Sequence, residues 1–450
     1  MGSAEIVIVG GGISGLSLAY FLIQKNSQLN IKIVEAEKRA GGKIITENIS
    51  GFLCEGGVNG FLSNKPSTIS LAKELNIEPL RGSESSKIRY ILIDGKLIRV
   101  PENPIKFFLT PLLSFSGKIR MLREYFTPPL KEEIDETVES FVSRRVGKEF
   151  YEKLIDAMST GIYAGDPSKM SMKSCFPKVY WLEKRHGGLL KGLIALKKEK
   201  KDTKAQPSGV LMSFKGGMSE LIQSLERHLS SRILKGKKVL SIDRKNTYYT
   251  VHLDDGNFIE AEKVILACPA HESAEILKEL SSELSDILKT IPYPPLSVVA
   301  FGFKKEQIGF GTSLYGFLIP YREQRKILGT LFDSSIFPNR APESYVLLRS
   351  MIGGRRAPEL AMLPDEKLID TALSELKPLL NIKGDPEFIK IFRWEKAIPQ
   401  YELGHEDKLN RIEQILSEFS GLYLTGNAYR GVSVNDCIEN SLKLAEGIMV

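Results

Sequence analysis

The sequence predicts a mixed α/β fold that combines a Rossmann-like nucleotide-binding unit with a strand-rich region and a helical insertion. Residues 6–9 form a short continuous apolar run, which is typical of a buried parallel strand. A glycine-rich turn at 10–15 follows, and residues 14–25 then carry apolar side chains at helical spacing. A second apolar strand occupies residues 31–34. Strand, glycine turn, helix and strand in this order predict the first βαβ unit of a dinucleotide-binding fold.

Composition limits the class of protein. The chain has 450 residues, enough for roughly two or three domains, with 42% hydrophobic and 26% charged residues, as in ordinary globular proteins. A net charge of +7 is mild for this length and does not indicate nucleic acid as a partner. The four cysteines and five histidines are scattered, so neither a metal site nor a disulfide framework is predicted. No signal peptide and no long apolar span are evident, and we expect a reducing, cytoplasmic compartment.

The spacing of apolar residues changes between strand-like and helix-like along the chain, which predicts three domains. Each domain is formed by one or more segments of the chain. A hairpin is expected at 87–95, with Asp94-Gly95 as its turn. Five lysines between residues 197 and 204 fit a solvated mobile loop, with contact to a membrane surface as the alternative. The expected segments are 1–86, 206–290 and 391–450 for the nucleotide-binding domain, 87–103 and 291–390 for the strand-rich substrate domain, and 104–205 for the helical insertion.

Each glycine of the turn has its own physical role. Gly10 permits the tight turn, Gly12 lets backbone N–H groups approach a pyrophosphate, and Gly15 allows close packing of helix on strand. The phosphates would lie at the positive end of the helix dipole. Glu35 ends the second strand and can accept hydrogen bonds from two ribose hydroxyls. Its charge would repel a 2′-phosphate, which argues against NADP.

Two further glycine-rich segments favour FAD over NAD. Residues 39–43 (Arg-x-Gly-Gly-Lys) and 52–57 (Phe-x-x-Glu-Gly-Gly) follow the first unit closely, and this run resembles the amine-oxidase and phytoene-desaturase superfamily of FAD proteins. No second strand–glycine turn–helix unit is evident, so the electrons should come from an organic substrate. The segment 426–437 predicts a strand, a glycine loop and a helix start, whose dipole would stabilise negative charge on a reduced flavin.

With these motifs in hand, the chain resembles the protoporphyrinogen oxidase family of oxygen-dependent FAD enzymes along essentially its whole length. The segment 159–166 (Ser-Thr-Gly-Ile-Tyr-Ala-Gly-Asp), with the arginine pair at 144–145 upstream, is more discriminating than the glycine turn. The other matching pieces are 146–147, 215–218, 393–394, 399–401 and 436–438.

The resemblance implies which residues contact FAD. Where many relatives have Pro at position 58 and some have Arg at 59, this chain has Val58 and Asn59, which keeps backbone contacts plausible but removes a cation. The implied contacts are Gly10, Gly11, Gly12, Ile13, Ser14, Gly15, Glu35, Ala36, Gly42, Lys43, Gly57, Val58, Asn59, Gly60, Val239, Trp394, Gly426, Val432, Ser433 and Val434.

The resemblance also implies a substrate site. Arg89 matches the arginine that pairs with a propionate, and its guanidinium suits a carboxylate because it can bind both oxygens. Gly161, Leu318, Leu331 and Met351 would form the surrounding walls. No acid or base residue is identified, since N5 of the flavin would accept the hydride.

The implied reaction is oxidation of protoporphyrinogen IX to protoporphyrin IX in haem biosynthesis, with O₂ as acceptor, six electrons removed and H₂O₂ released. One alternative is a coproporphyrinogen III oxidase that forms coproporphyrin III. A second is an amine oxidase of the same superfamily, for which Trp394 and Tyr401 are the only hint of an aromatic cage. A flavin-binding assembly factor without catalysis is the non-enzymatic alternative.

The resemblance further implies peripheral attachment to the inner face of the cytoplasmic membrane, a homodimer, and product handover to ferrochelatase. An ordinary domain core or dimer surface is the alternative for the apolar segment of the insertion. The side chains expected to enter one leaflet are Ile105, Phe107, Phe108, Leu109, Leu112, Leu113 and Phe115, with Lys106, Lys118, Arg120 and Arg123 facing the headgroups.

Overall fold

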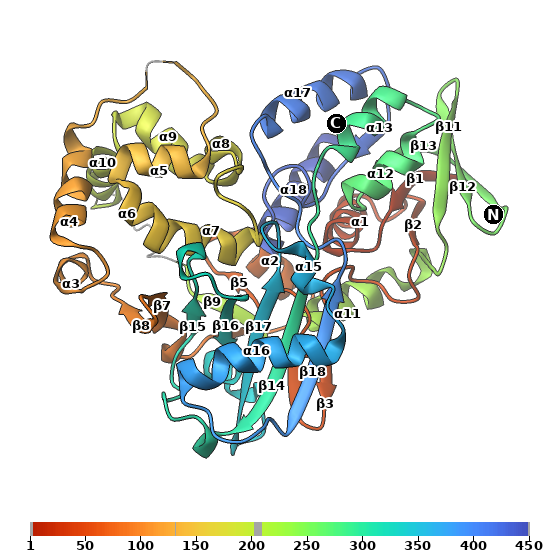
Figure 1. Ribbon diagram of the computed structural model, residues 1–450. Coiled ribbons are helices and arrows are strands. Elements are labelled where there is room, and N and C mark those ends of the chain that lie inside the picture. The colour runs from red at the N-terminus through yellow and green to blue at the C-terminus, as the bar shows by residue number, and fades with distance from the viewer. Residues whose placement is uncertain (1–2, 131, 202–208, 449–450) are drawn as a thin grey trace.

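A computed structural model describes residues 3–130, 132–201 and 209–448, and Figure 1 shows two large sheets and a group of helices. In the first sheet the predicted strand at the N-terminus is central and pairs in parallel with the strands on both sides. The strand order is β10 (Ile233–Lys235), β2 (Ile31–Glu35), β1 (Ser3–Val9), β13 (Phe258–Leu266), β12 (Tyr248–Leu253) and β11 (Val239–Lys245), with β19 (Leu422–Leu424) beside β13.

The first sheet is covered on both faces, which explains why its central strand is apolar throughout. Ile6 and Ile8 point into one hydrophobic cluster, and Val7 and Val9 point into another on the opposite face. Helices from distant parts of the sequence therefore complete one two-sided unit. The first face carries α1 (Ile13–Lys25), α2 (Pro66–Glu74), α11 (Ser219–Leu229) and α18 (Val434–Ile448), and the second carries α12 (Ala270–Leu277), α13 (Ser282–Lys289) and α17 (His405–Leu416).

The second sheet lies below the first in Figure 1. One face packs on the long helix α16 (Asp365–Leu380), and the other packs on β4 (Phe52–Glu55) and on the helical insertion. The predicted hairpin is confirmed, with its turn at Asp94-Gly95, and it joins this sheet by parallel pairing. The strand order is β18 (Phe388–Trp394), β14 (Leu296–Lys304), β17 (Tyr345–Gly353), β16 (Ile327–Phe332), β15 (Gly316–Leu318), β7 (Arg89–Ile93) and β8 (Lys96–Val100).

The helical insertion is the group on the left of Figure 1. Its helical character was predicted correctly, but the expected lysine loop was wrong: Lys197 and Lys198 lie on the last helix of the insertion, and Lys204 lies outside the described residues. Within the described residues, no helix is both long and apolar enough to cross a bilayer. The helices are α3 (Pro104–Leu109), α4 (Phe115–Leu122), η2 (Arg123–Phe126), α5 (Val138–Val146), α6 (Lys148–Phe150), η3 (Tyr151–Ile155), α7 (Asp156–Tyr163), α8 (Met172–Cys175), α9 (Pro177–His186) and α10 (Leu189–Lys201).

Two side chains expected to enter a leaflet do not face solvent. Leu112 is fully buried and packs with Ile91 and Ala157, and Leu113 is 3% exposed. This part of the expectation was wrong, because both side chains are buried, and Leu112 packs between the insertion and the second sheet. Leu109 and Phe115, by contrast, are among the most exposed apolar side chains described.

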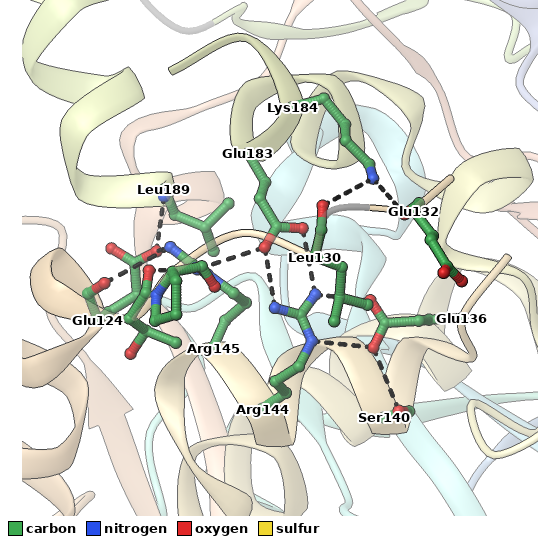
Figure 2. A network of polar contacts seen from close by, with 12 residues as sticks. Glu124, Leu130, Glu132, Glu136, Ser140, Arg144, Arg145, Glu183, Lys184 and Leu189 are labelled. Atoms are coloured by element: carbon green, nitrogen blue, oxygen red, sulfur yellow. Dashed lines mark hydrogen bonds and ion pairs between the residues drawn. The ribbon is translucent and has the colours of Figure 1, made fainter. Parts of the chain in front are cut away.

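The arginine pair at 144–145 organises the insertion, as Figure 2 shows. Arg145 is fully buried and pairs with Glu124, which is also fully buried, and with Glu183 at 3.3 Å. Arg144 pairs with the same Glu183 at 2.9 Å. Glu124 additionally accepts the backbone N–H of Leu189 at 2.6 Å, at the first turn of α10. One buried charge cluster therefore fixes η2, α5, α9 and α10 to one another.

Candidate active site

A cavity of about 570 Å³ opens where β1, β2 and β13 end, at the carboxyl edge of the first sheet. This is the edge at which open α/β sheets bind their ligands. Thirteen of the predicted cofactor residues line the cavity: Gly10, Gly12, Ile13, Ser14, Glu35, Ala36, Gly42, Lys43, Val58, Val239, Gly426, Val432 and Val434.

The glycine turn has the geometry that a bound diphosphate needs. A Cβ on Gly15 would lie 2.0 Å from the carbonyl oxygen of Gly10, so α1 can pack against the turn only because residue 15 lacks a side chain. A Cβ on Gly12 would meet no protein atom within 4 Å, so this position faces open space. The protein therefore requires Gly15 for its own packing and leaves room at Gly12 for a ligand.

Glu35 is held in place by backbone donors. The N–H of Gly11 donates to Oε2 at 2.7 Å, and the N–H of Glu37 donates to Oε1 at 2.8 Å. The side chain is 8% exposed and lines the cavity. Each oxygen still has a lone pair that can accept from a ribose hydroxyl.

Lys43 places a desolvated ammonium in the cavity wall. Burial lowers the pKa of this lysine to about 8, and its Nζ lies 5.4 Å from the centroid of the Tyr293 ring. A buried ammonium is costly unless an anion accompanies it. The diphosphate of a dinucleotide is an anion of the required kind.

We expect the affinity for FAD to fall as pH rises above about 8. The free protein then loses the Lys43 proton, whereas a bound diphosphate raises the pKa of the ammonium, so binding must take up a proton. Linkage predicts a dissociation constant that is flat below about pH 8 and rises by up to about tenfold per pH unit above it. Flavin fluorescence titrations from about pH 7 to about pH 9.5 measure this. Lys43→Met should bind FAD more weakly, with no such slope, and an equal slope in both proteins would contradict the assignment.

The loop after β4 is braced by the second sheet. Trp394 Nε1 donates to the carbonyl of Gly56 at 2.8 Å, and Arg349 Nη1 donates to the carbonyls of Glu55 at 3.1 Å and Gly57 at 2.8 Å. Three consecutive carbonyls are thus fixed by β17 and β18. Trp394 does not line the cavity, so the structure places it as a brace for this loop.

Within the predicted stretch 57–60, only Val58 lines the cavity. Gly60 packs on backbone, since a Cβ there would lie 2.3 Å from the carbonyl oxygen of Met212. The side-chain amide of Asn59 is buried, and neither of its polar atoms has a hydrogen-bond partner among the described residues. Unpaired buried amides are rare, so this one favours a ligand group beside the loop.

The start of α18 forms the other side of the cavity. Val432 and Val434 line it, whereas Ser433 lies between them and caps the helix. The N–H and Oγ of Ser433 donate to Asp436 Oδ2 at 3.1 and 2.6 Å, and Ser433 Oγ accepts from the N–H of Asp436 at 3.1 Å. Lys65 pairs with the same carboxylate at 2.6 Å. This reciprocal capping fixes the loop that presents the helix N-terminus to the cavity.

Several residues that line the cavity were not predicted from the sequence. They follow β13, which pairs with β1 but has no glycine signature, or lie in the turn between β10 and β11. The parallel pairing of β13 was the missing information, since its carboxyl end must open on the same edge. Gly11, Gly15, Gly57, Asn59, Gly60, Trp394 and Ser433 were predicted but are not lining residues, and the missed set includes Lys237, Lys238, Cys268, Pro269 and Glu272.

The second sheet brings the predicted substrate residues onto one face. Phe317, Phe332 and Ile352 point into the core under α16, so their neighbours Leu318, Leu331 and Met351 point to the opposite face. In the register of the sheet, Gly316 lies between Arg89 and Leu331, while Gly329 lies between Leu318 and Met351.

Gly161 and Arg89 complete this arrangement from two sides. A Cβ on Gly161 would lie 2.8 Å from Leu318 Cδ2, so a side chain there would displace this leucine, and glycine lets α7 pack directly on it. Arg89 is exposed, and its guanidinium lies 5.0 Å from the centroid of the Tyr315 ring. The result is an apolar face with a solvent-facing cation at one end.

The glycine turn, the acidic residue at the end of β2 and the braced loop define a flavin-dependent oxidoreductase with a Rossmann-type cofactor site. A family model for flavin-containing amine oxidoreductases matches residues 13–449. The chain belongs to this family, and its cofactor is FAD.

Named relatives match almost the whole chain. Coproporphyrinogen III oxidase of Bacillus subtilis is 32% identical and covers 97% of this chain and 96% of its own length. The chloroplastic protoporphyrinogen oxidase of Oryza sativa subsp. japonica is 34% identical, with 99% and 88% covered. The crystal structure of an Exiguobacterium protein named "putative protoporphyrinogen oxidase" superposes with a TM-score of 0.85 at 27% identity, covering 100% of this chain and 99% of that chain.

Proposed function

We propose that this flavoenzyme oxidises a porphyrinogen to the porphyrin, with protoporphyrinogen IX as substrate, O₂ as acceptor and a place in haem biosynthesis. The observation that carries the proposal is the apolar face formed by Leu318, Leu331 and Met351, with the exposed Arg89 at its end. A tetrapyrrole offers apolar faces and peripheral carboxylates, which match this combination. The names of the relatives from Bacillus subtilis and Oryza sativa support the same chemistry.

The described residues act chiefly by positioning. FAD, when bound, supplies the chemistry by accepting an electron pair from a carbon of the substrate. Glu35 would hold the ribose and Lys43 the diphosphate, while the braced loop at Val58 would hold the flavin end. Leu318 and Gly161 would exclude water from the reacting face, and Arg89 would orient a carboxylate. We assign no acid or base residue, since orientation of an easily oxidised macrocycle can supply much of the rate.

The decisive experiment compares two porphyrinogens with FAD-loaded protein. Porphyrin fluorescence reports product, and an oxygen electrode with peroxide detection reports the acceptor. We expect faster turnover of protoporphyrinogen IX, with H₂O₂ formed as O₂ is consumed. Faster turnover of coproporphyrinogen III would select that substrate instead, the function named for the Bacillus subtilis relative. Turnover of simple amines would indicate an amine oxidase, and bound FAD without any turnover would indicate an assembly factor.

We expect Arg89→Ala to raise KM for the porphyrinogen about tenfold while kcat changes less than about threefold. A hydrogen bond to a charged group contributes about 1.5–3 kcal/mol, and this one acts on binding rather than on the reacting carbon. Arg99→Ala is the matched control, because Arg99 is also exposed at this sheet edge. In the strand register Arg99 lies opposite Tyr90, whose side chain packs on the α16 face, so Arg99 belongs to the face away from the proposed substrate. Steady-state rates at low and high substrate separate the two constants. An unchanged KM in Arg89→Ala would remove the propionate role.

We also propose that the helical insertion attaches the protein peripherally to the cytoplasmic membrane. Phe115 and Phe126 are 80% and 81% exposed on α4 and η2, and Leu193 is 57% exposed on α10. The buried charge cluster of Figure 2 connects η2 to α10, so Phe126 and Leu193 lie on elements that are fixed to each other. Arg123 and Lys197 are exposed on the same elements and could face anionic headgroups. The predicted homodimer and the handover to ferrochelatase stay predictions.

Vesicle flotation tests the attachment. The wild-type protein should float with vesicles of phosphatidylglycerol and phosphatidylcholine, whereas a variant with Phe115→Ser and Phe126→Ser should stay in the dense fraction. Phe258→Ser is the control, because Phe258 is 51% exposed but lies at the start of β13 in the first sheet. Equal flotation of all three proteins would exclude this surface.

A further inference from the structure

Arg356 lies where three segments of the proposed substrate site meet. Its Nη1 contacts Asp156 Oδ1 at 2.6 Å, at the start of α7, and its Nε contacts Asp166 Oδ1 at 3.0 Å, just beyond the end of that helix. The guanidinium also lies over the ring of Tyr321, 4.4 Å from the centroid. One side chain thus contacts both ends of α7 and the connection between β15 and β16.

Each of these contacts is a few residues from a predicted wall residue. Gly161 lies on α7 between Asp156 and Asp166, and Leu318 ends β15 shortly before Tyr321. Met351 lies on β17, the strand that leads to Arg356. These three wall residues lie on α7, β15 and β17, and Arg356 contacts or directly follows each of these elements.

Around Arg356, the backbone of α7 packs directly on the segments that follow β15 and β17, and this contact region is called the joint. The N–H of Tyr321 donates to Asp156 Oδ2 at 2.8 Å, and the N–H of Arg355 donates to the carbonyl of Ala164 at 2.8 Å. A Cβ on Gly354, whose φ is +82°, would come within 2.5 Å of that same carbonyl oxygen. The C-terminus of α7 is therefore held directly against the turn that follows β17.

The charges of this joint are largely shielded from water. The side chains of Asp156, Asp166 and Arg356 are 4%, 14% and 16% exposed. Pairs at this depth are coupled much more strongly than surface pairs, and removing one partner leaves an uncompensated buried charge. Without the guanidinium the two carboxylates would move apart or toward solvent, and α7 would move with them.

We propose that Arg356 is a positioning residue that sets the spacing between α7 and the substrate face of the second sheet, and with it the width of the porphyrinogen site. The inference rests on the proposed function. It also assigns a role to Asp166, the last residue of the discriminating segment 159–166. No contact of Asp166 with cofactor or substrate was predicted. The FAD cavity is formed by other segments and should be unaffected.

The test compares Arg356→Gln with Arg356→Lys and with the control Arg355→Gln. Arg355 is the neighbouring residue, but its side chain pairs with Glu402 at 2.7 Å and has no ion pair to α7. Arg356→Gln should raise KM for the porphyrinogen about tenfold and weaken porphyrin binding to a similar degree, while kcat falls less than about threefold. Arg356→Lys keeps one ion pair and should recover part of the loss, and Arg355→Gln should match the wild type within about twofold.

Two measurements besides turnover separate positioning from general stability. Fluorescence titration with protoporphyrin IX reports the substrate site, and flavin fluorescence reports FAD affinity, which should not change. If Arg356→Gln fails to fold, Asp166→Asn replaces it and should raise KM about threefold, since the pair with Asp156 remains. A folded, FAD-loaded Arg356→Gln or Asp166→Asn with wild-type KM and porphyrin affinity would overturn the inference. Wild-type protein that neither turns over porphyrinogen nor binds porphyrin would instead reject the proposed function, and the inference with it.

Discussion

Gly15→Ala should abolish useful FAD binding, with a loss of affinity of about 100-fold or more, equivalent to about 2.7 kcal/mol. The added Cβ would lie 2.0 Å from the carbonyl oxygen of Gly10, which is backbone and cannot rotate away. The start of α1 must therefore move, and with it the N–H groups that face the cavity. Flavin fluorescence titration of the deflavinated protein measures the loss, and circular dichroism follows the packing of the first sheet.

Two glycine controls identify the cause. Gly12→Ala meets no protein atom within 4 Å, so it should leave the fold intact and weaken FAD binding only by contact with the ligand. Gly447→Ala, on the exposed side of α18 with open space around it, should leave FAD affinity unchanged and stabilise the helix by about 0.5–1 kcal/mol. Wild-type FAD affinity in Gly15→Ala would show that the turn does not hold the cofactor.

Arg145→Met should destabilise the helical insertion by about 3–5 kcal/mol, which is the cost typical of breaking a buried ion pair. The substitution leaves Glu124 buried at 0% exposure without its cation, whereas Glu183, at 1% exposure, keeps its pair with Arg144 (Figure 2). Because Glu124 also accepts the N–H of Leu189, the N-terminus of α10 should open first. In a chain of several domains a single unfolding free energy is not defined, so native-state hydrogen exchange of the α10 amides is the suitable measurement.

The controls for this prediction test charge rather than volume. Lys148→Met removes a cation that is 75% exposed and pairs with Glu152, and it should change local stability by less than about 0.5 kcal/mol. Adding Glu124→Gln to Arg145→Met removes one uncompensated charge and should recover part of the loss. Equal exchange rates in wild-type and Arg145→Met protein would contradict the central role of this cluster.

Local sequence patterns were sufficient to predict the first βαβ unit. The apolar run at 6–9, the spacing of Gly10, Gly12 and Gly15, and the acidic residue at the end of the second strand each encode their geometry within a few residues. The hairpin at Asp94-Gly95 is another such case, because its turn needs residues that adopt positive φ. The helical character of 104–205 followed in the same way from periodicity.

Contacts between distant segments could not be predicted from pattern. The brace on the loop after β4 joins Gly56 and Gly57 to Trp394 and Arg349, about 300 residues further along the chain. No local signal marks Arg349 as a partner of that loop, since a buried arginine and a surface arginine look alike in sequence. Leu112 was misplaced for the same reason, because an apolar residue in a connection between two short helices fits a contact between domains as well as a membrane.

The sequence by itself determined the cofactor class and the turn that holds its phosphates, since a glycine turn and an acidic strand end depend on backbone geometry over few residues. The family resemblance added the substrate class. The tertiary structure decided which residues act together: the face shared by Leu318, Leu331 and Met351, the contact of Gly161 with Leu318, and the joint at Arg356. Strand register and packing between segments set these relations, and neither is encoded in any short stretch of the chain.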